Sequence, residues 1–424
     1  VSDIVIGGTQ DVGAIEQDET GETEWRTITQ GDGAIAVIDD SNEDYSLRYT
    51  SAPRLSGLRV RRVDADNGEE TNERVDLEVL DNGGSPSGIT LSAAFDGTIG
   101  FYNPIALNAV DPSRMLIATG AGSEGHLYES TDFGDTLELF GDYTPSGDSY
   151  TFTDNFGVTT AIAYGGRKDG ADEPEVIYLG SRDGVVRVRE PGDAEPTATT
   201  AAFPGSVVGD IALHPEDYET AAVAARDGVY LTDDAGGAWT DITGNLADIA
   251  QVDPSNLELR GVSYLDGEVH DIIVVGAVNG AYMTTTALPD YWVEVGDNLP
   301  NAVVYDLDYD HADEMLVAGT LGRGAWTLGD LYGESTFTGG AGDVIEVDLS
   351  HILDGEDYEL LSFGIEADDR TLTTETDITF NDLRLVDGDD EYGRFVFSDR
   401  TSGEAFDDSG LMYFVPSVAD DLAS

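Results

Sequence analysis

Short apolar segments alternate with turns rich in glycine and aspartate along most of the chain. A pair of such segments joined by a tight glycine turn occurs six times. The six copies occupy residues 4–17, 115–130, 176–190, 221–234, 272–286 and 315–329. Asp-Gly and Asn-Gly turns favour the positive φ of tight hairpins, so each copy predicts two antiparallel strands.

The spacing of these hairpins predicts a repeated four-stranded unit. The turn glycines Gly125, Gly184, Gly228, Gly280 and Gly324 follow one another at intervals of 44 to 59 residues. A strand is also expected before and after each hairpin, as 209–215 and 238–243 are around 221–234. Gly13 lies 112 residues before Gly125, which leaves room for a degenerate unit near residues 33–102.

Four short strands per repeat of this length are typical of β-propeller blades. We therefore predict an all-β chain that contains a β-propeller of seven blades, with six to eight as the range. A β-sandwich is the alternative architecture, but it does not account for the repeat period.

Two of the turns carry a more specific pattern, Ser/Thr-x-Asp-x-Gly-x-x-Trp. One copy is Thr232, Asp234, Gly236 and Trp239, and the other is Ser130, Asp132 and Gly134, with Leu137 in place of the Trp. We expect the hydroxyl and carboxylate groups to bond backbone amides of the turn, and the glycine to adopt positive φ. The tryptophan is expected to pack between blades.

These turns, together with GGTQDVG (7–13), Val-Asp-Pro (110–112) and GTLGRGAW (319–326), resemble the Asp-box propeller families of BNR type. Those families include sortilin-like propellers, the photosystem assembly-factor propeller, sialidases and xyloglucanases. The resemblance covers roughly residues 1–330 and implies the fold. It does not select a function, because Asp-boxes in these families lie away from the ligand-binding face.

The C-terminal residues predict a second, smaller module. The segment 333–343 is rich in small residues and is expected to be a linker between the propeller at 1–332 and a module at 344–424. Alternating apolar segments separated by Asp/Gly turns make that module a small β-sandwich-like unit of five strands. We expect it to serve attachment or oligomerisation.

The charge of the chain is extreme. There are 85 Asp and Glu against 20 Lys and Arg, a formal net charge of -65, and Lys168 is the one lysine. Because 40% of the residues are hydrophobic, disorder is excluded as the overall state. A field this negative repels nucleic acid, and no stretch is long and apolar enough for a spanning helix, so membrane insertion is not expected either.

Molar salt shortens the Debye length to ~3 Å and so relieves the self-repulsion of such a chain. The acidic composition therefore resembles that of haloarchaeal proteins or of proteins from haloarchaeal viruses. We expect an extracellular, cell-surface or virion location, with no signal peptide in the given chain. The alternative is an ordinary acidic secreted protein.

The sequence lacks the motifs that most forms of catalytic chemistry require. The chain has no Cys and no Gly-x-Ser-x-Gly elbow, and its five histidines show no metal-binding spacing, so zinc is not expected. Glycoside hydrolysis would need two carboxylates across a cleft. Asp11 in GGTQDVG is the candidate, because that motif recurs in relatives of the xyloglucanase group; the alternative is a turn carboxylate that bonds backbone amides.

Carboxylate-dense segments are the candidate binding sites for Ca²⁺ or Mg²⁺, and these cations are the candidate cofactors. The candidate ligands are Asp64, Asp66, Asp306, Asp308, Asp310, Asp387 and Asp389. On a strand, the three aspartates of 306–310 would share one solvated face, with Leu307 and Tyr309 directed inward. The other four lie in turns that an acidic protein would also have without a cation.

These observations favour a non-enzymatic surface or virion structural protein. Its propeller face would recognise a glycan or a protein on a cell surface or particle, and its C-terminal module would tether it to a larger assembly or homo-oligomer. The alternative is a secreted propeller glycoside hydrolase, xyloglucanase- or sialidase-like, that uses paired carboxylates.

Overall fold

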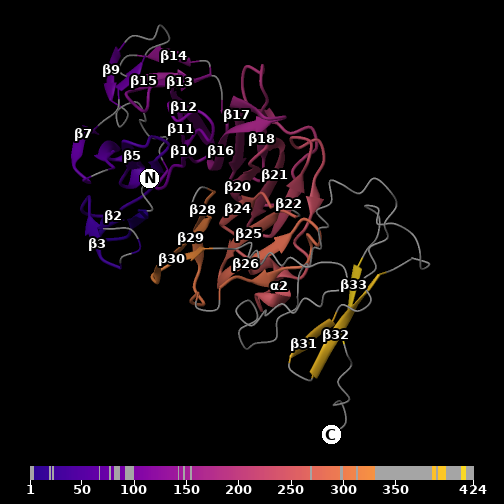
Figure 1. Ribbon diagram of the computed structural model, residues 1–424. Coiled ribbons are helices and arrows are strands. Elements are labelled where there is room, and N and C mark those ends of the chain that lie inside the picture. The colour runs from indigo at the N-terminus through magenta and orange to yellow at the C-terminus, as the bar shows by residue number, and fades with distance from the viewer. Residues whose placement is uncertain are drawn as a thin grey trace, which may run out of the picture. The chain divides into compact units, whose positions relative to one another are not determined.

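The computed structural model of the chain, shown in Figure 1, describes residues 4–329 with short gaps, and three C-terminal segments, 384–387, 390–397 and 412–416. The gaps are 19–20, 22, 66, 76–77, 81–85, 91–99, 142, 147–148, 153–154, 268–269, 297–298 and 312–313. The chain divides into two compact units, 1–362 and 363–424. Within the described residues, no helix has the length and apolar character needed to cross a bilayer.

The described part of the first unit forms eight sheets, and seven of them, built on antiparallel strands and following one another along the chain, are the blades of a β-propeller. Blade 1 has β1 (Ile6–Thr9), β2 (Gly13–Gln17) and β3 (Trp25–Thr27), and blade 2 has β4 (Ala36–Asp39), β5 (Tyr45–Thr50), β6 (Arg59–Asp64) and β7 (Glu70–Val75). Blade 3 has β10 (Ile105–Leu107), β11 (Met115–Ala121), β12 (Glu124–Ser130) and β13 (Thr136–Phe140). Blade 4 has β16 (Thr159–Lys168), β17 (Ala171–Ser181), β18 (Val186–Arg189) and β19 (Thr197–Ala198).

The last three blades follow the same order. Blade 5 has β20 (Val208–His214), β21 (Asp217–Ala225), β22 (Gly228–Thr232) and β23 (Thr240–Asp241), and blade 6 has β24 (Gly261–Leu265), β25 (Ile272–Ala277), β26 (Gly280–Thr285) and β27 (Val293–Glu294). Blade 7 has β28 (Val304–Asp310), β29 (Met315–Thr320) and β30 (Gly324–Gly329). The prediction of an all-β propeller with seven blades is confirmed, and the degenerate unit expected near 33–102 contains blade 2.

A few further elements lie outside the four-strand pattern of the blades. They are β8 (Glu78–Leu80) and β9 (Pro86–Thr90), the hairpin of β14 (Tyr143–Ser146) and β15 (Ser149–Phe152), the short helix α2 (Leu246–Ile249), and two 3-10 turns, Pro53–Leu55 and Pro254–Asn256. β8 pairs in parallel with β13, so this insertion widens the outer edge of blade 3.

The blades have two distinct ends. The N–H of Phe156, ahead of β16, donates to the carbonyl of Gly125 in the preceding hairpin (3.0 Å). A Cβ on Gly125 would lie 1.6 Å from the carbonyl oxygen of Gly157, so this close approach requires glycine. We call the end that carries these hairpins and the starts of the first strands the hairpin end. The turn end carries the turns between first and second strands and those between third and fourth strands.

Apolar clusters join consecutive blades from blade 2 to blade 7. Each pairs the middle strands of one blade with the first two strands of the next, as Tyr49 and Val60 do with Ile117. Four similar clusters follow in the later blades. None of the five lies between the described residues of blades 1 and 2, where the buried contact is instead an ion network around Glu16.

The described part of the second unit is a three-stranded antiparallel sheet. Its strands are β31 (Arg384–Asp387), β32 (Asp390–Phe397) and β33 (Met412–Pro416). They overlap the last three of the five predicted strands, 377–386, 393–399 and 411–418. The first two, 344–350 and 358–366, and the predicted linker at 333–343 lie outside the described residues.

Candidate functional site

The two Asp-box turns lie at the turn end. In blade 5 the hydroxyl of Thr232 donates to Asp234 Oδ1 (2.9 Å) and accepts the N–H of Gly236 (2.8 Å), while Asp234 accepts the N–H of Ala238 (2.7 Å). Gly236 has φ +84°. Trp239 is half-buried and packs edge-on against Phe203. The side chains of this turn are therefore used in holding the turn itself.

The blade 3 copy has the same bonds. Ser130 donates to Asp132 (2.8 Å) and accepts the N–H of Gly134 (2.8 Å), and Asp132 accepts the N–H of Thr136 (2.9 Å). Gly134 has φ +81°. Here Leu137, in the tryptophan position, is fully buried in the cluster between blades 2 and 3.

Replacing Asp234 with alanine should lower the free energy of unfolding by about 1–2 kcal/mol, because one hydroxyl and one amide lose their acceptor. Urea unfolding of Asp234→Ala measures the loss, and Asp233→Ala, at the exposed neighbouring position, is the control. An equal effect of both variants would contradict the structural role of this turn.

β-Bulges interrupt the first strands of three blades near the hairpin end. The register shifts between Thr159 and Ala161 in β16, between Val208 and Asp210 in β20, and between Val304 and Asp306 in β28. A bulge redirects a side chain that regular pairing would place on the other face of the strand. In β28 the extra residue is Tyr305, which is 47% exposed.

Carboxylates gather on these first strands. Asp306 and Asp308 share one face of β28, exposed to solvent, whereas Leu307 and Tyr309 between and beyond them are buried. Asp210 on β20 accepts the N–H groups of Ile211 (2.8 Å) and, across the blade boundary, of Val262 (3.0 Å). We call Asp40, Asp210, Asp306, Asp308 and Asp310 the inner carboxylates.

Four of the inner carboxylates, Asp40, Asp210, Asp306 and Asp308, have a pKa above that of an ordinary aspartate. Desolvation by the surrounding protein, with the charges of Asp306 and Asp308, raises the pKa of Asp210 to about 8. Desolvation and the charges of Asp306, Asp310 and Asp40 raise the pKa of Asp308 to about 6. Burial and the charge of Asp310 likewise raise the pKa of Asp40, so blades 2 and 7 present carboxylates to one another. Water reaches Asp306 and Asp308, which moderates these effects.

Two arginines flank this group at the hairpin end. The guanidinium group of Arg260 lies 4.5 Å from the ring centroid of Tyr305 and pairs with Glu258 (3.3 Å). Arg226 pairs with the same carboxylate of Glu258 (3.4 Å). Both arginines thus share one carboxylate, which balances one of their two positive charges.

Exposed apolar side chains also concentrate at the hairpin end. Among the described residues, the large apolar side chains that remain exposed are Val12, Phe101, Tyr102, Phe133, Leu288, Tyr305, Leu321 and Trp326. Five of these eight lie at the hairpin end: Val12 and Leu321 in hairpin turns, Phe101 and Tyr102 ahead of β10, and Tyr305 as the second residue of β28. Phe101 and Tyr102 are 51% and 60% exposed and contact each other edge to face. Aromatic faces beside carboxylates suit a ligand with both apolar and hydroxyl groups.

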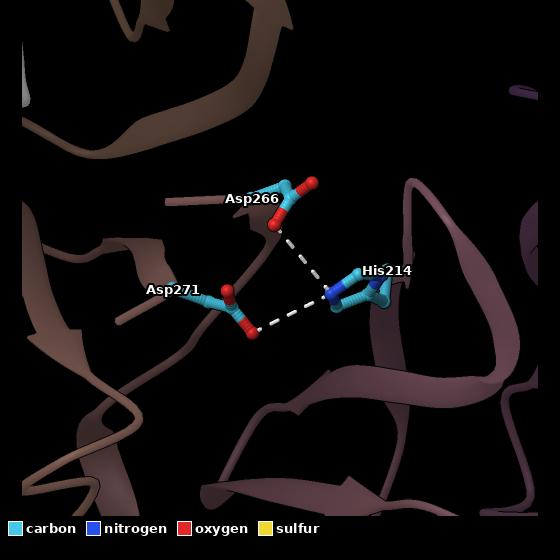
Figure 2. Close-up of side chains that lie close together, drawn as sticks. All are labelled: His214, Asp266 and Asp271. Atoms are coloured by element: carbon cyan, nitrogen blue, oxygen red, sulfur yellow. Dashed lines mark ion pairs between the residues drawn. The ribbon is translucent and has the colours of Figure 1, made fainter. Parts of the chain in front are cut away.

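A second polar group lies at the turn end, between blades 5 and 6. Figure 2 shows His214, at the end of β20, directed toward Asp266 and Asp271. Its Nε2 lies 3.8 Å from Asp266 Oδ1 and 3.6 Å from Asp271 Oδ2. Tyr264 donates its hydroxyl to Asp271 (2.9 Å). Within the described residues, this is the set of His and carboxylate groups close enough together to share a metal ion.

The other nitrogen of His214 argues against a metal at this place. Nδ1 accepts the backbone N–H of Glu216 (3.0 Å), so it carries no proton. A neutral ring then has its proton on Nε2, the atom that would have to bind the metal. Ligating histidines normally donate the second N–H to an acceptor, and here that position faces a donor. The geometry fits an Nε2–H group directed at two carboxylates.

Asp11 and Asp64, the remaining candidates whose side chains the structure describes, lie in turns of different blades. Asp11 lies in the β1–β2 turn with φ +64°, and its N–H donates to Asp32 (2.8 Å). Asp64 accepts the N–H of Asn67 (3.3 Å) in the β6–β7 turn. Asp387 ends β31 in the second unit, where its backbone alone is described, and Asp66 and Asp389 lie outside the described residues.

Neither Asp210 nor the pairing of His214 with two aspartates was predicted from the sequence. Asp210 could have been found, because aligning the first strands GDIALH (209–214) and YDLDYD (305–310) places Asp210 opposite Asp306. The His214 group had no such signal, since its members come from different blades and meet when the blades pack.

The fold and site together define a β-propeller with carboxylates on its first strands and an aromatic hairpin end. No protein-family model matches the chain, and no curated protein does either. A GH74 enzyme from Niastella koreensis is 18% identical with a TM-score of 0.49, over 77% of this chain and 50% of that one. An ancestral GH74 enzyme is 13% identical with a TM-score of 0.45, over 70% of this chain and 36% of that one. The matched region thus amounts to half or less of either enzyme.

Proposed function

We propose that this propeller binds a carbohydrate at its hairpin end. The observation that carries the proposal is the set of exposed aromatic and apolar side chains at that end, where Tyr305 precedes Asp306 on β28 and Asp210 lies near the start of β20. Sugar rings stack their C–H faces on aromatic side chains, and their hydroxyls donate hydrogen bonds to carboxylates. A glycan therefore makes use of both features, whereas a flat apolar partner would leave the carboxylates desolvated.

Replacing Tyr102 with alanine should weaken glycan binding by about tenfold, since one stacked aromatic ring contributes on the order of 1 kcal/mol or more. The binding constant for xyloglucan and a panel of other neutral polysaccharides would be measured by calorimetry in molar KCl. Leu288→Ala, at an exposed apolar position of the turn end, is the control. Binding by neither the parent chain nor the variants would refute the proposal and leave a protein ligand as the alternative.

Hydrolysis of a glycosidic bond is the second candidate function. It is favoured by Asp210, whose pKa near 8 keeps it protonated at neutral pH, beside the more exposed Asp306. A proton donor paired with a second carboxylate is what glycoside hydrolysis requires. Release of reducing sugar from xyloglucan by the parent chain and not by Asp210→Asn would establish it. With Asp210 as the acid, the rate should fall as pH rises through about 8. Binding without release would leave a non-enzymatic glycan-binding protein.

We further propose that the protein acts at a surface, a virion or a cell envelope of a halophile, as its composition suggests. Its charge of -65 and single lysine support a high-salt setting. Fractionation of native particles and envelopes from the source organism, with an antibody to this chain, tests the location.

A further inference from the structure

The contact between the described residues of blades 1 and 2 is polar, unlike the five apolar interfaces from blade 2 to blade 7. Alternate residues of β5 and β6 face blade 3 in an apolar cluster, and they include Leu47, Tyr49 and Val60. The residues between them face the other way, toward blade 1. Those of β5 are Ser46, Arg48 and Thr50, each no more than 6% exposed. This face therefore buries charge where the other interfaces bury hydrocarbon.

In the part of this network whose side chains the structure describes, positive charge exceeds negative charge. Arg26, Arg48 and Arg61 all pair with the single fully buried carboxylate of Glu16. Arg61 also pairs with Glu70 (2.9 Å). Among the described side chains of the network, three guanidinium groups thus meet two carboxylates. A buried charge without compensation is costly, so one further negative charge would be stabilising here.

Two of these cations stand directly opposite each other. Arg48 on β5 and Arg61 on β6 are register partners, and both are almost completely buried. Like charges at directly opposed positions destabilise a strand pair. Burial and the charges of Arg61 and Arg26 lower the pKa of Arg48 despite its contact with Glu16. Glu16, shared among three arginines, therefore does not fully balance Arg48.

Hydrogen-bond donors at the same place have no acceptor. In the described structure, Nε of Arg61 and the hydroxyl of Thr50 are buried without a hydrogen-bond partner, and both residues are 1% exposed. Thr50 lies two residues along β5 from Arg48, on the same face, and so diagonally across from Arg61. Buried polar groups almost always have partners, including ordered ions or water.

We propose that a small monovalent anion of the chloride type binds between blades 1 and 2, held by Arg48, Arg61 and the Thr50 hydroxyl. One such ion balances the charge of the network and accepts the two unused hydrogen bonds. Because Arg61 and Thr50 are each only 1% exposed, a small ion is favoured over a polyatomic one. The site is separate from the inner carboxylates and from the hairpin end, so it does not depend on the proposed function.

Bromide is the probe for this site, because it substitutes for chloride and scatters anomalously. Crystals of the full chain grown in molar KBr should show an anomalous peak bounded by Arg48, Arg61 and Thr50. The absence of a peak there, or a water molecule in its place, would overturn the proposal. The parent chain is used, so the result does not depend on whether a variant folds.

Thermal unfolding provides the second measurement. At equal potassium concentration, KCl should raise the melting temperature above its value in potassium gluconate, whose anion is too large for the site, by about 2–4 °C. Thr50→Val should lose most of this increment, and Thr240→Val, at an exposed position of blade 5, should keep it. Equal increments in both variants would mean an adventitious ion only and would reject the site.

Discussion

Replacing Glu16 with glutamine should destabilise the propeller by about 3–5 kcal/mol, the loss expected when one partner of a buried ion pair is removed. Glu16 is fully buried and is the shared partner of Arg26, Arg48 and Arg61. Without its charge, the two most buried arginines would face each other with little compensation. No apolar cluster between the described residues of blades 1 and 2 is available to offset the loss.

Urea unfolding of Glu16→Gln in molar KCl measures this effect. Glu24→Gln is the matched control, because Glu24 is exposed at the other side of blade 1 and the change of charge is the same. The deficit of Glu16→Gln should persist at high salt, since buried pairs are screened far less than surface pairs. A loss below 1 kcal/mol would show that this network does not hold blade 1 to blade 2.

Acid should have a related effect. Burial alone would raise the pKa of Glu16, but hydrogen bonds and charges from Arg61, Arg48 and Arg26 lower it below its ordinary value. A carboxyl with a lowered pKa stabilises the fold above its unfolded-state pKa, and this contribution is lost as pH falls through the folded-state value. The parent chain should therefore lose more stability on acidification than Glu16→Gln does.

Salt should change stability on a larger scale. The formal charge of -65 repels itself throughout the chain, and molar salt screens that repulsion. We expect the melting temperature to rise by roughly 10 °C or more between 0.1 M and 3 M KCl, as calorimetry at a series of salt concentrations would record.

A variant with fewer surface charges provides the control for this experiment. Replacing the exposed acids Glu43, Glu195 and Asp233 by their amides should raise stability at 0.1 M KCl and have little effect at 3 M. If the melting temperature of the parent chain did not change with salt, the halophilic interpretation of the composition would be wrong.

Much of the fold follows from local sequence pattern. Glycine turns such as that at Gly125 predicted the hairpins. The spacing between the hairpins predicted the number of strands in each blade. The alternation of 306–310 predicted one solvated face, and Leu307 and Tyr309 are indeed buried. These features are local or periodic, so they leave a signal that one sequence can show.

The candidate site was less accessible to the same reasoning. In a chain where one residue in five is acidic, no single aspartate stands out by type. Asp210 differs from the rest because Val262 of the next blade bonds it and neighbouring blades desolvate it. The exposed aromatics at the hairpin end are far apart in sequence, and so is the residue pair formed by Glu16 and Arg61.

By itself, the sequence determined the class of structure, the repeat of the blades, the two Ser/Thr-x-Asp-x-Gly turns and the net charge of the chain. The tertiary structure decided which charged groups lie together: the inner carboxylates, the His214 group, and the arginines around Glu16. The physical reason is the sequence separation over which each interaction acts. Turn chemistry and strand alternation act over a few residues, whereas desolvation and charge pairing depend on groups that packed blades bring together from distant parts of the chain.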